Sequence, residues 1–139
     1  MQPKGLIDTG PIVALLDRGD RWHKICVETF SSLPLPLATT SAVLAELFHF
    51  LDDHPQRIAA AWQTLRSGAI TVLPITDQDM PALERLMKQY EDRPMDFADA
   101  TLVHLAKRES LTTIFTIDHN DFETYRISGK QKFYIVPSR

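Results

Sequence analysis

Five acidic side chains carry the candidate chemistry of this sequence: Asp8, Glu46, Asp96, Asp99 and Asp118. The first and the last each follow a short apolar run that predicts a buried strand, so each marks the carboxyl end of a strand. In an open parallel sheet, ligands bind beside the carboxyl ends of the strands. We therefore expect Asp8 and Asp118 to lie along one rim of a sheet.

The other three acids are expected on helices beside that rim. Glu46 lies at the margin of a wide apolar stripe in the helix predicted for residues 41–51. Asp96 and Asp99 have the i, i+3 spacing of a helix N-cap and its third residue. Each acid also has a purely structural interpretation, which is capping for the aspartates and a solvated position for Glu46.

Carboxylates gathered at one rim repel one another, and they remain ionised together only if a cation lies among them. Hard oxygen ligands, without a cysteine or histidine cluster, favour Mg²⁺ or Mn²⁺ over Zn²⁺. Such an ion lowers the pKa of an attacking water and neutralises charge on the leaving oxygen. The acids thus predict metal-assisted hydrolysis of a phosphodiester, which needs no nucleophilic side chain.

The elements that must position these acids alternate between strand and helix. Predicted strands cover residues 5–7, 35–38, 70–75, 113–117 and 132–136. Predicted helices cover residues 12–16, 22–31, 41–51, 55–67 and 97–109, and a further helix begins at residue 77 or 79 and runs to about residue 90. Because the connections are too long for hairpins, the pattern indicates an α/β fold whose central, mostly parallel sheet has helices on both sides.

Composition limits the class of protein. The chain has 139 residues, with 15 Lys and Arg against 18 Asp and Glu, a formal net charge of −3. This length fits a single domain over residues 1–139, and the charge argues against a protein that coats nucleic acid by charge alone.

The single cysteine, Cys26, is expected to be a small, buried apolar residue. No apolar run approaches the roughly 20 residues of a membrane span, so we expect a cytoplasmic protein without a membrane partner.

Four segments in order resemble a known family. They are Leu6-Ile7-Asp8-Thr9-Gly10-Pro11, Ser41-Ala42-Val43-Leu44-Ala45-Glu46, Met95-Asp96-Phe97-Ala98-Asp99-Ala100-Thr101-Leu102-Val103 and Thr116-Ile117-Asp118-His119-Asn120-Asp121-Phe122. Together they resemble the PIN-domain ribonucleases, in particular the VapC-type toxins of bacterial toxin–antitoxin pairs. Each motif is short, but the four span nearly the whole chain in the order and with the separations of the family.

The resemblance implies a PIN-like fold and assigns roles to individual residues. It places four catalytic and metal-binding acids on Asp8, Glu46, Asp99 and Asp118. Asp96 matches a supplementary metal position, and Thr9 and Thr116 match hydroxyl positions that would orient waters or ligands. It further implies an endoribonuclease that depends on Mg²⁺ or Mn²⁺, an RNA substrate, a homodimer and a cognate antitoxin that inserts residues into the acidic groove.

Two other classes of function stay open at this point. Asp8-Thr9-Gly10 is also the triplet of aspartic proteases, but their nearly all-β, glycine-rich fold conflicts with a chain that has 5 glycines and a helix-rich pattern. The other class is a PIN-like RNA- or protein-binding module without catalysis, although all four acids are present. His119 after the last acid reads as a solvated loop histidine, and Arg85, Lys88 and Arg93 read as a solvated helix face or as phosphate contacts.

Overall fold

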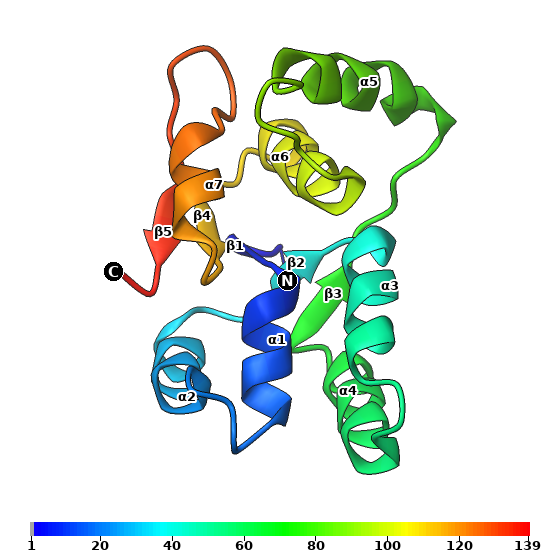
Figure 1. Cartoon of the computed structure of the whole chain (residues 1–139), viewed down its shortest axis with the longest axis vertical. Helices are drawn as coiled ribbons and strands as arrows, with labels where there is room; N and C mark the ends of the chain where they lie inside the picture. The colour runs from blue at the N-terminus through cyan, green and yellow to red at the C-terminus, as the bar shows by residue number, and fades with distance from the viewer. Residues whose placement is uncertain (1) are drawn as a thin grey trace.

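Five short parallel strands form the centre of the molecule (Figure 1). The computed structural model describes residues 2–139. The strands are β1 (Gly5–Ile7), β2 (Leu37–Thr39), β3 (Ile70–Val72), β4 (Thr113–Phe115) and β5 (Tyr134–Val136). They are ordered β3-β2-β1-β4-β5, and every neighbouring pair is parallel. The predicted α/β fold with a parallel sheet is confirmed.

Helices cover both sides of this sheet. They are α1 (Thr9–Leu16), α2 (His23–Ser32), α3 (Ser41–Phe50), α4 (Pro55–Ser67), α5 (Met80–Gln89), α6 (Phe97–Glu109) and α7 (His119–Thr124), with the short 3₁₀ turn η1 (Asp77–Asp79) before α5. In Figure 1, α5 and α6 lie above the sheet, whereas α1, α2 and α4 lie below it. Helix α3 contacts both α1 and α6 and so joins the two layers.

The order of the strands creates a switch point in the middle of the sheet. From β1 the chain moves outward through β2 to β3, then returns to the other side of β1 and continues through β4 to β5. A crevice opens at such a point, beside the carboxyl ends of the two central strands. Here these strands are β1 and β4, with Ile7 in register with Phe115. The residues that follow them are therefore neighbours in space.

Local signals set the limits of most helices. Helix α6 begins at the N-cap Asp96, whose carboxylate accepts the backbone N–H of Asp99 at 2.8 Å, and it covers the predicted residues. Helix α4 begins at Pro55 and ends before Gly68, which has a φ of 84° that a glycine adopts without steric penalty. Strand β2 begins after Pro36, which cannot donate a ladder hydrogen bond, so it starts two residues later and ends one residue later than predicted.

Two predictions for the C-terminal part need correction. Residues 119–124 form α7, which the sequence did not predict, because the Asp118 side chain accepts the backbone N–H of Asp121 at 3.2 Å. His119 is part of this helix, and its Nε2 is 2.7 Å from the carbonyl oxygen of Pro137. The interpretation of His119 as a solvated loop residue is therefore wrong.

The central strands are the most deeply buried part of the chain. Leu6, Ile7, Ile114 and Phe115 are completely inaccessible, so the residues just beyond them are held by a rigid base. Cys26 is also fully buried, as predicted, and burial raises the pKa of its thiol to about 11. Within residues 2–139, no helix combines the length and the apolar character that crossing a bilayer requires.

Candidate metal-binding and catalytic site

Asp8 lies at the switch point, where it is 9 % exposed. Its Oδ1 accepts the backbone N–H of Thr9 at 2.8 Å, and its Oδ2 accepts the hydroxyl of Thr116 at 2.9 Å. The same Thr116 oxygen accepts the backbone N–H of Asp118 at 3.0 Å. Thr116, just after β4, therefore links the Asp8 carboxylate that follows β1 to the backbone of Asp118.

Gly10 allows α1 to begin this close to the end of β4. A Cβ atom at residue 10 would lie 2.8 Å from Cγ1 of Ile117, closer than real Cβ contacts. A larger residue would therefore push the first turn of α1 away from β4. Because Asp8 caps that turn, the glycine helps to keep Asp8 and Asp118 on the same rim.

Glu46 reaches the same rim from α3. The hydroxyl of Thr9 donates to its Oε1 at 2.8 Å, so Thr9 contacts two of the predicted acids, one through its backbone and one through its side chain. Helix α3 is fixed next to α6 by a buried hydroxyl pair, Thr40 and Thr101, whose oxygens are 2.8 Å apart. The two threonines predicted beside the acids, Thr9 and Thr116, thus both donate to carboxylates.

The last two predicted acids stand at the start of α6 and differ in their surroundings. Asp96 is exposed and caps the helix. Asp99 is half-buried, and its Oδ2 accepts the hydroxyl of Tyr125 at 2.9 Å. Tyr125 itself is only 1 % exposed and is one of the largest fully buried side chains. The buried tyrosine thus fixes the orientation of the Asp99 carboxylate through this hydrogen bond.

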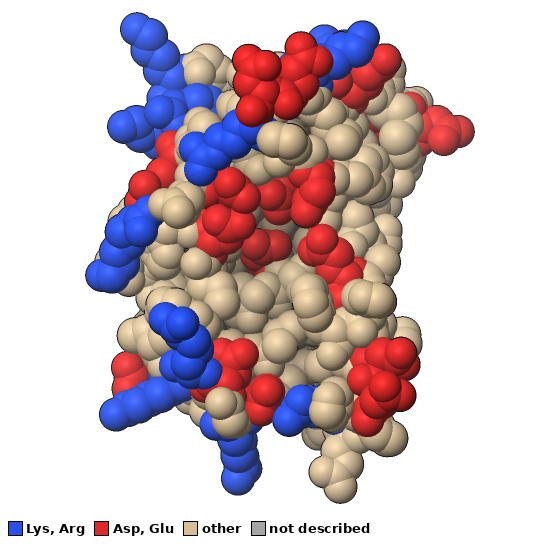
Figure 2. Space-filling view, in the orientation of Figure 1, with Lys and Arg blue, Asp and Glu red and all other residues tan. Residues whose placement is uncertain are grey.

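The electrostatics show that these acids share one small space. Burial raises the pKa of Asp8 to about 6, and the charges of Glu46 and Asp118 add to the rise. Burial also raises the pKa of Asp99 to about 8, with further repulsion from Asp8, Asp96 and Asp118. Figure 2 shows acidic side chains grouped around a hollow in the middle of the face. The structure therefore brings the five predicted acids together.

The donor set fits a hard divalent cation. All five side chains offer carboxylate oxygens, and the pKa values of Asp8 and Asp99 are raised mainly by burial and further by the neighbouring acids. Among residues 2–139, no three His, Cys, Asp or Glu side chains already converge as a metal-binding group. Hydroxyl groups instead hold the individual carboxylates, as Thr116 does for Asp8 and Tyr125 for Asp99.

Tyr125 and Asp121 of the site did not emerge from the sequence, and Arg93, which was expected on a solvated helix face or at a phosphate, pairs with Asp121 in the structure. Tyr125 depends on the path of α7, which was not predicted. The pKa of Asp121 is raised by burial and by Asp118, so it is a further acid on the rim. Arg93 lies 3.4 Å from Asp121 and also donates to the hydroxyl of Thr124, which joins the loop before α6 to α7. The spacing of Asp118 and Asp121 was visible in the sequence, but helix capping explains it equally well.

The fold and this acidic rim define a small α/β protein whose carboxylates are grouped at the switch point of a parallel sheet. The sequence profile of the PIN domain matches residues 5–127, and the chain belongs to the PIN-domain family. It is 28 % identical over 134 residues to the ribonuclease VapC26 of Mycobacterium tuberculosis, an alignment that covers 95 % of this chain and 99 % of that protein. The resemblance to VapC-type proteins is thereby confirmed.

A solved structure shows the same fold. The chain superimposes on the crystal structure of Mycobacterium tuberculosis VapC20, a toxin that cleaves the sarcin–ricin loop, with a TM-score of 0.74. The match covers 84 % of this chain and 91 % of the other, at 22 % sequence identity. At this identity the likeness is evidence for the PIN-like fold, and it leaves the substrate of this chain to be determined.

Proposed function

We propose that this protein is a metal-dependent endoribonuclease of the VapC type, which hydrolyses phosphodiester bonds in RNA. The observation that carries the proposal is the grouping of Asp8, Glu46, Asp99 and Asp118 at the β1–β4 switch point, where burial, and then repulsion from the other acids, raises the pKa of Asp8 and of Asp99. The relationship to a ribonuclease over nearly the whole chain supports the same activity.

The side chains of the rim have distinct tasks in this proposal. Asp8, Glu46, Asp99 and Asp118, with Asp96 in addition, would hold Mg²⁺ or Mn²⁺. Such an ion would lower the pKa of the attacking water and neutralise charge on the leaving oxygen. Thr116 and Tyr125 fix the orientation of Asp8 and Asp99, and Thr9 fixes that of Glu46. Groups held in this way need little rearrangement when they engage a ligand.

Removal of divalent cations tests the proposal. We expect the protein to cleave single-stranded and looped RNA in Mg²⁺ or Mn²⁺, to lose cleavage in EDTA, and to regain it when the cation is restored. Gel analysis of end-labelled RNA measures this directly. Cleavage that persists in EDTA would contradict a metal-dependent mechanism. RNA binding without cleavage under all cation conditions would instead indicate a binding module that has lost catalysis.

An apolar face next to the acidic rim supports the proposed homodimer. Met80, Met87 and Phe97 are 42 %, 37 % and 44 % exposed, and they line one surface groove between α5 and α6. Phe97 also lines the neighbouring groove that contains Glu46 and Asp96. We expect Phe97→Glu to convert a dimer into a monomer in sedimentation experiments. A wild-type monomer, or a variant dimer of unchanged stability, would contradict this assignment.

The proposed function also includes a cognate antitoxin and a cytoplasmic location. The antitoxin would place basic residues in the acidic hollow, because the uncompensated carboxylates there attract cations. The test is the neighbouring reading frame: its product should copurify with this chain and inhibit cleavage. A neighbour whose product neither binds nor inhibits would remove the support for an antitoxin encoded there, without affecting the proposed nuclease activity.

A further inference from the structure

A second concave site lies away from the acidic hollow, between α5, α6 and the loop that follows α7. It is a cavity of about 410 Å³, a size typical of sites for small organic ligands. In Figure 1 these three elements form the upper part of the molecule. Its basic lining residues are Arg85 from α5, Lys107 from α6 and Arg126 from the loop. Its apolar lining includes Leu86, Val103 and Ile127.

The charge of this cavity is opposite to that of the chain as a whole. Acids outnumber bases in the sequence, yet no Asp or Glu lines the cavity. Within residues 2–139, neither Arg85 nor Lys107 forms an ion pair, whereas the neighbouring Lys88 lies 3.7 Å from Glu84 and Arg108 pairs with Asp79 and Glu109. Two exposed cations without partners, next to a fixed guanidinium, create a local site for anions.

The walls of the cavity are held in place by other contacts. Nη1 of Arg126 donates to the carbonyl oxygens of Glu123, Thr124 and Tyr125, at 2.7–3.0 Å. The backbone N–H of Arg126 donates to the hydroxyl of Tyr90, at the end of α5, at 2.9 Å. The position of the loop relative to α5 is therefore fixed before any ligand binds.

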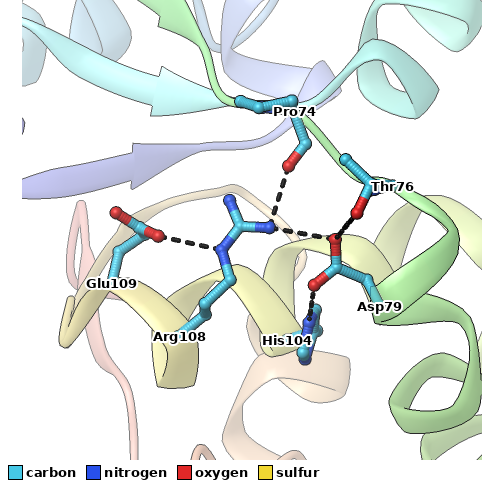
Figure 3. A network of polar contacts seen from close by, with 6 residues as sticks. All are labelled: Pro74, Thr76, Asp79, His104, Arg108 and Glu109. Carbon is cyan, nitrogen blue, oxygen red and sulfur yellow. Dashed lines mark hydrogen bonds and ion pairs between the residues drawn. The ribbon is translucent and has the colours of Figure 1, made fainter.

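A buried carboxylate fixes the two helical walls against each other (Figure 3). Asp79, 8 % exposed, lies just before α5 and accepts hydrogen bonds from the backbone of Thr76 at 2.8 Å and from Arg108 of α6 at 3.2 Å. Its other oxygen is 2.8 Å from Nε2 of His104, another residue of the cavity wall. These contacts hold the pKa of Asp79 well below its usual range, so it stays ionised. The cavity is thus preformed.

We propose that this cavity binds a nucleotide unit. Arg85 and Lys107 would contact the phosphate, because guanidinium and ammonium groups form charge-assisted hydrogen bonds with phosphate oxygens. Leu86, Val103 and Ile127 offer an apolar wall for the base. Lys107 lies eight residues after Asp99 on the same helix, which corresponds to about 12 Å along its axis. The nucleotide is either free or part of the RNA strand cleaved at the acidic hollow; in the second case the inference rests on the proposed function.

Binding measurements with two probes test the proposal. We would titrate the protein with adenosine 5′-monophosphate and with a single-stranded RNA oligonucleotide, both in EDTA, so that RNA is not cleaved and no added cation attracts it to the acidic hollow. The variant Arg85→Gln/Lys107→Gln should bind at least one probe about tenfold more weakly or worse. For RNA, the salt dependence of binding should also become less steep, by about 0.7 in logarithmic slope for each lost phosphate contact.

A charge-matched variant provides the control. Lys24 and Arg66 are exposed on α2 and α4, on the other side of the sheet, and neither forms an ion pair within residues 2–139. Lys24→Gln/Arg66→Gln removes the same charge and should bind both probes as the wild type does. All four substituted residues are exposed, so urea unfolding should show unchanged stability for both variants.

The binding of the two probes by the two variants decides between a free nucleotide, an RNA strand and no nucleotide site in the cavity. Weaker binding of both probes by the cavity variant assigns the site to a nucleotide in either form, and weaker binding of RNA alone assigns it to the strand. Equal losses in the two variants, or a wild type that binds neither probe, would overturn the proposal. RNA cleavage in Mg²⁺, measured separately, tests the acidic centre, so failure of the cavity and failure of the proposed nuclease activity are distinguishable.

Discussion

Replacing Asp8 by Asn should abolish RNA cleavage, with a loss of at least about 100-fold at saturating Mg²⁺. Substitutions of residues that only support a metal ligand reduce affinity or activity by about 10- to 100-fold, so loss of a ligand should exceed that range. Asp8 is the most deeply buried of the five acids, and Thr9 and Thr116 hold both of its oxygens. The asparagine keeps the size of the side chain and one accepting oxygen, and its NH2 group can donate to the Thr116 oxygen, so the change removes the charge and one acceptor. Initial cleavage rates of labelled RNA measure the effect.

The Asp8→Asn substitution should leave the folded protein as stable as the wild type or more stable. A loss of RNA cleavage can then be attributed to the missing carboxylate and not to unfolding. Burial and like charges raise the pKa of Asp8 to about 6, so the ionised carboxylate destabilises the metal-free protein at neutral pH. Urea unfolding in EDTA should therefore show an Asp8→Asn variant at least as stable as the wild type. Asp52→Asn, in the exposed turn after α3, removes the same charge and should retain full activity. Equal cleavage by Asp8→Asn and the wild type would contradict the catalytic assignment.

The parts of the site that the sequence predicted are those fixed by short-range signals. The apolar runs before Asp8 and Asp118 define buried strands, and the rule that parallel strands present their carboxyl ends on one rim brings the two acids together. Helix α6 followed from its N-cap Asp96, which the structure confirms. These predictions succeeded because each depends on a few neighbouring residues and on a single topological rule.

The parts that the sequence did not predict depend on contacts between distant segments. Tyr125 reaches Asp99 only because α7 turns the chain back toward α6, and 26 residues separate the two side chains. Arg93 reaches Asp121 across 28 residues in the same way. His104 and Asp79 are likewise 25 residues apart, and no periodicity in the sequence relates them. Such pairs become visible only when the packing of helices is known.

The net charge of −3 is the sum over a surface that has one acidic region and one basic region. Several acids lie around the β1–β4 switch point, whereas cations line the cavity between α5 and α6. Near the C-terminus, Arg139 lies 3.0 Å from Glu123, so these two charges offset each other. Arg126 still lines the cavity. Under the two proposals above, the acidic region would hold the cation and the basic cavity would contact the nucleotide, although the chain as a whole is acidic.

The stability of the metal-free protein should fall as the pH rises from about 5 to 8. In the folded state, the pKa values of Asp8 and Asp99 are about 6 and about 8, above the usual aspartate pKa of 3.8. Within this window the folded state binds more protons than the unfolded state, so the free energy of unfolding decreases with pH. The decrease amounts to at most about 1.4 kcal/mol for each pH unit and each group. The lowered pKa of Asp79 acts only at more acidic pH and does not disturb the measurement.

The Asp99→Asn variant isolates the contribution of Asp99 to the pH dependence of stability. Added metal then tests whether the carboxylates bind a cation together. In urea unfolding with EDTA, this variant should lose stability less steeply than the wild type, above all between about pH 7 and 8, where Asp8 is mostly ionised and Asp99 still titrates. Mg²⁺ or Mn²⁺ should stabilise the wild type more at pH 8 than at pH 6, because the cation competes with protons for the same carboxylates. At 100 times the dissociation constant the gain is about 2.7 kcal/mol. A stability profile identical in wild type and variant, or equal stabilisation by metal at both pH values, would show that these carboxylates do not act as one cation-binding group.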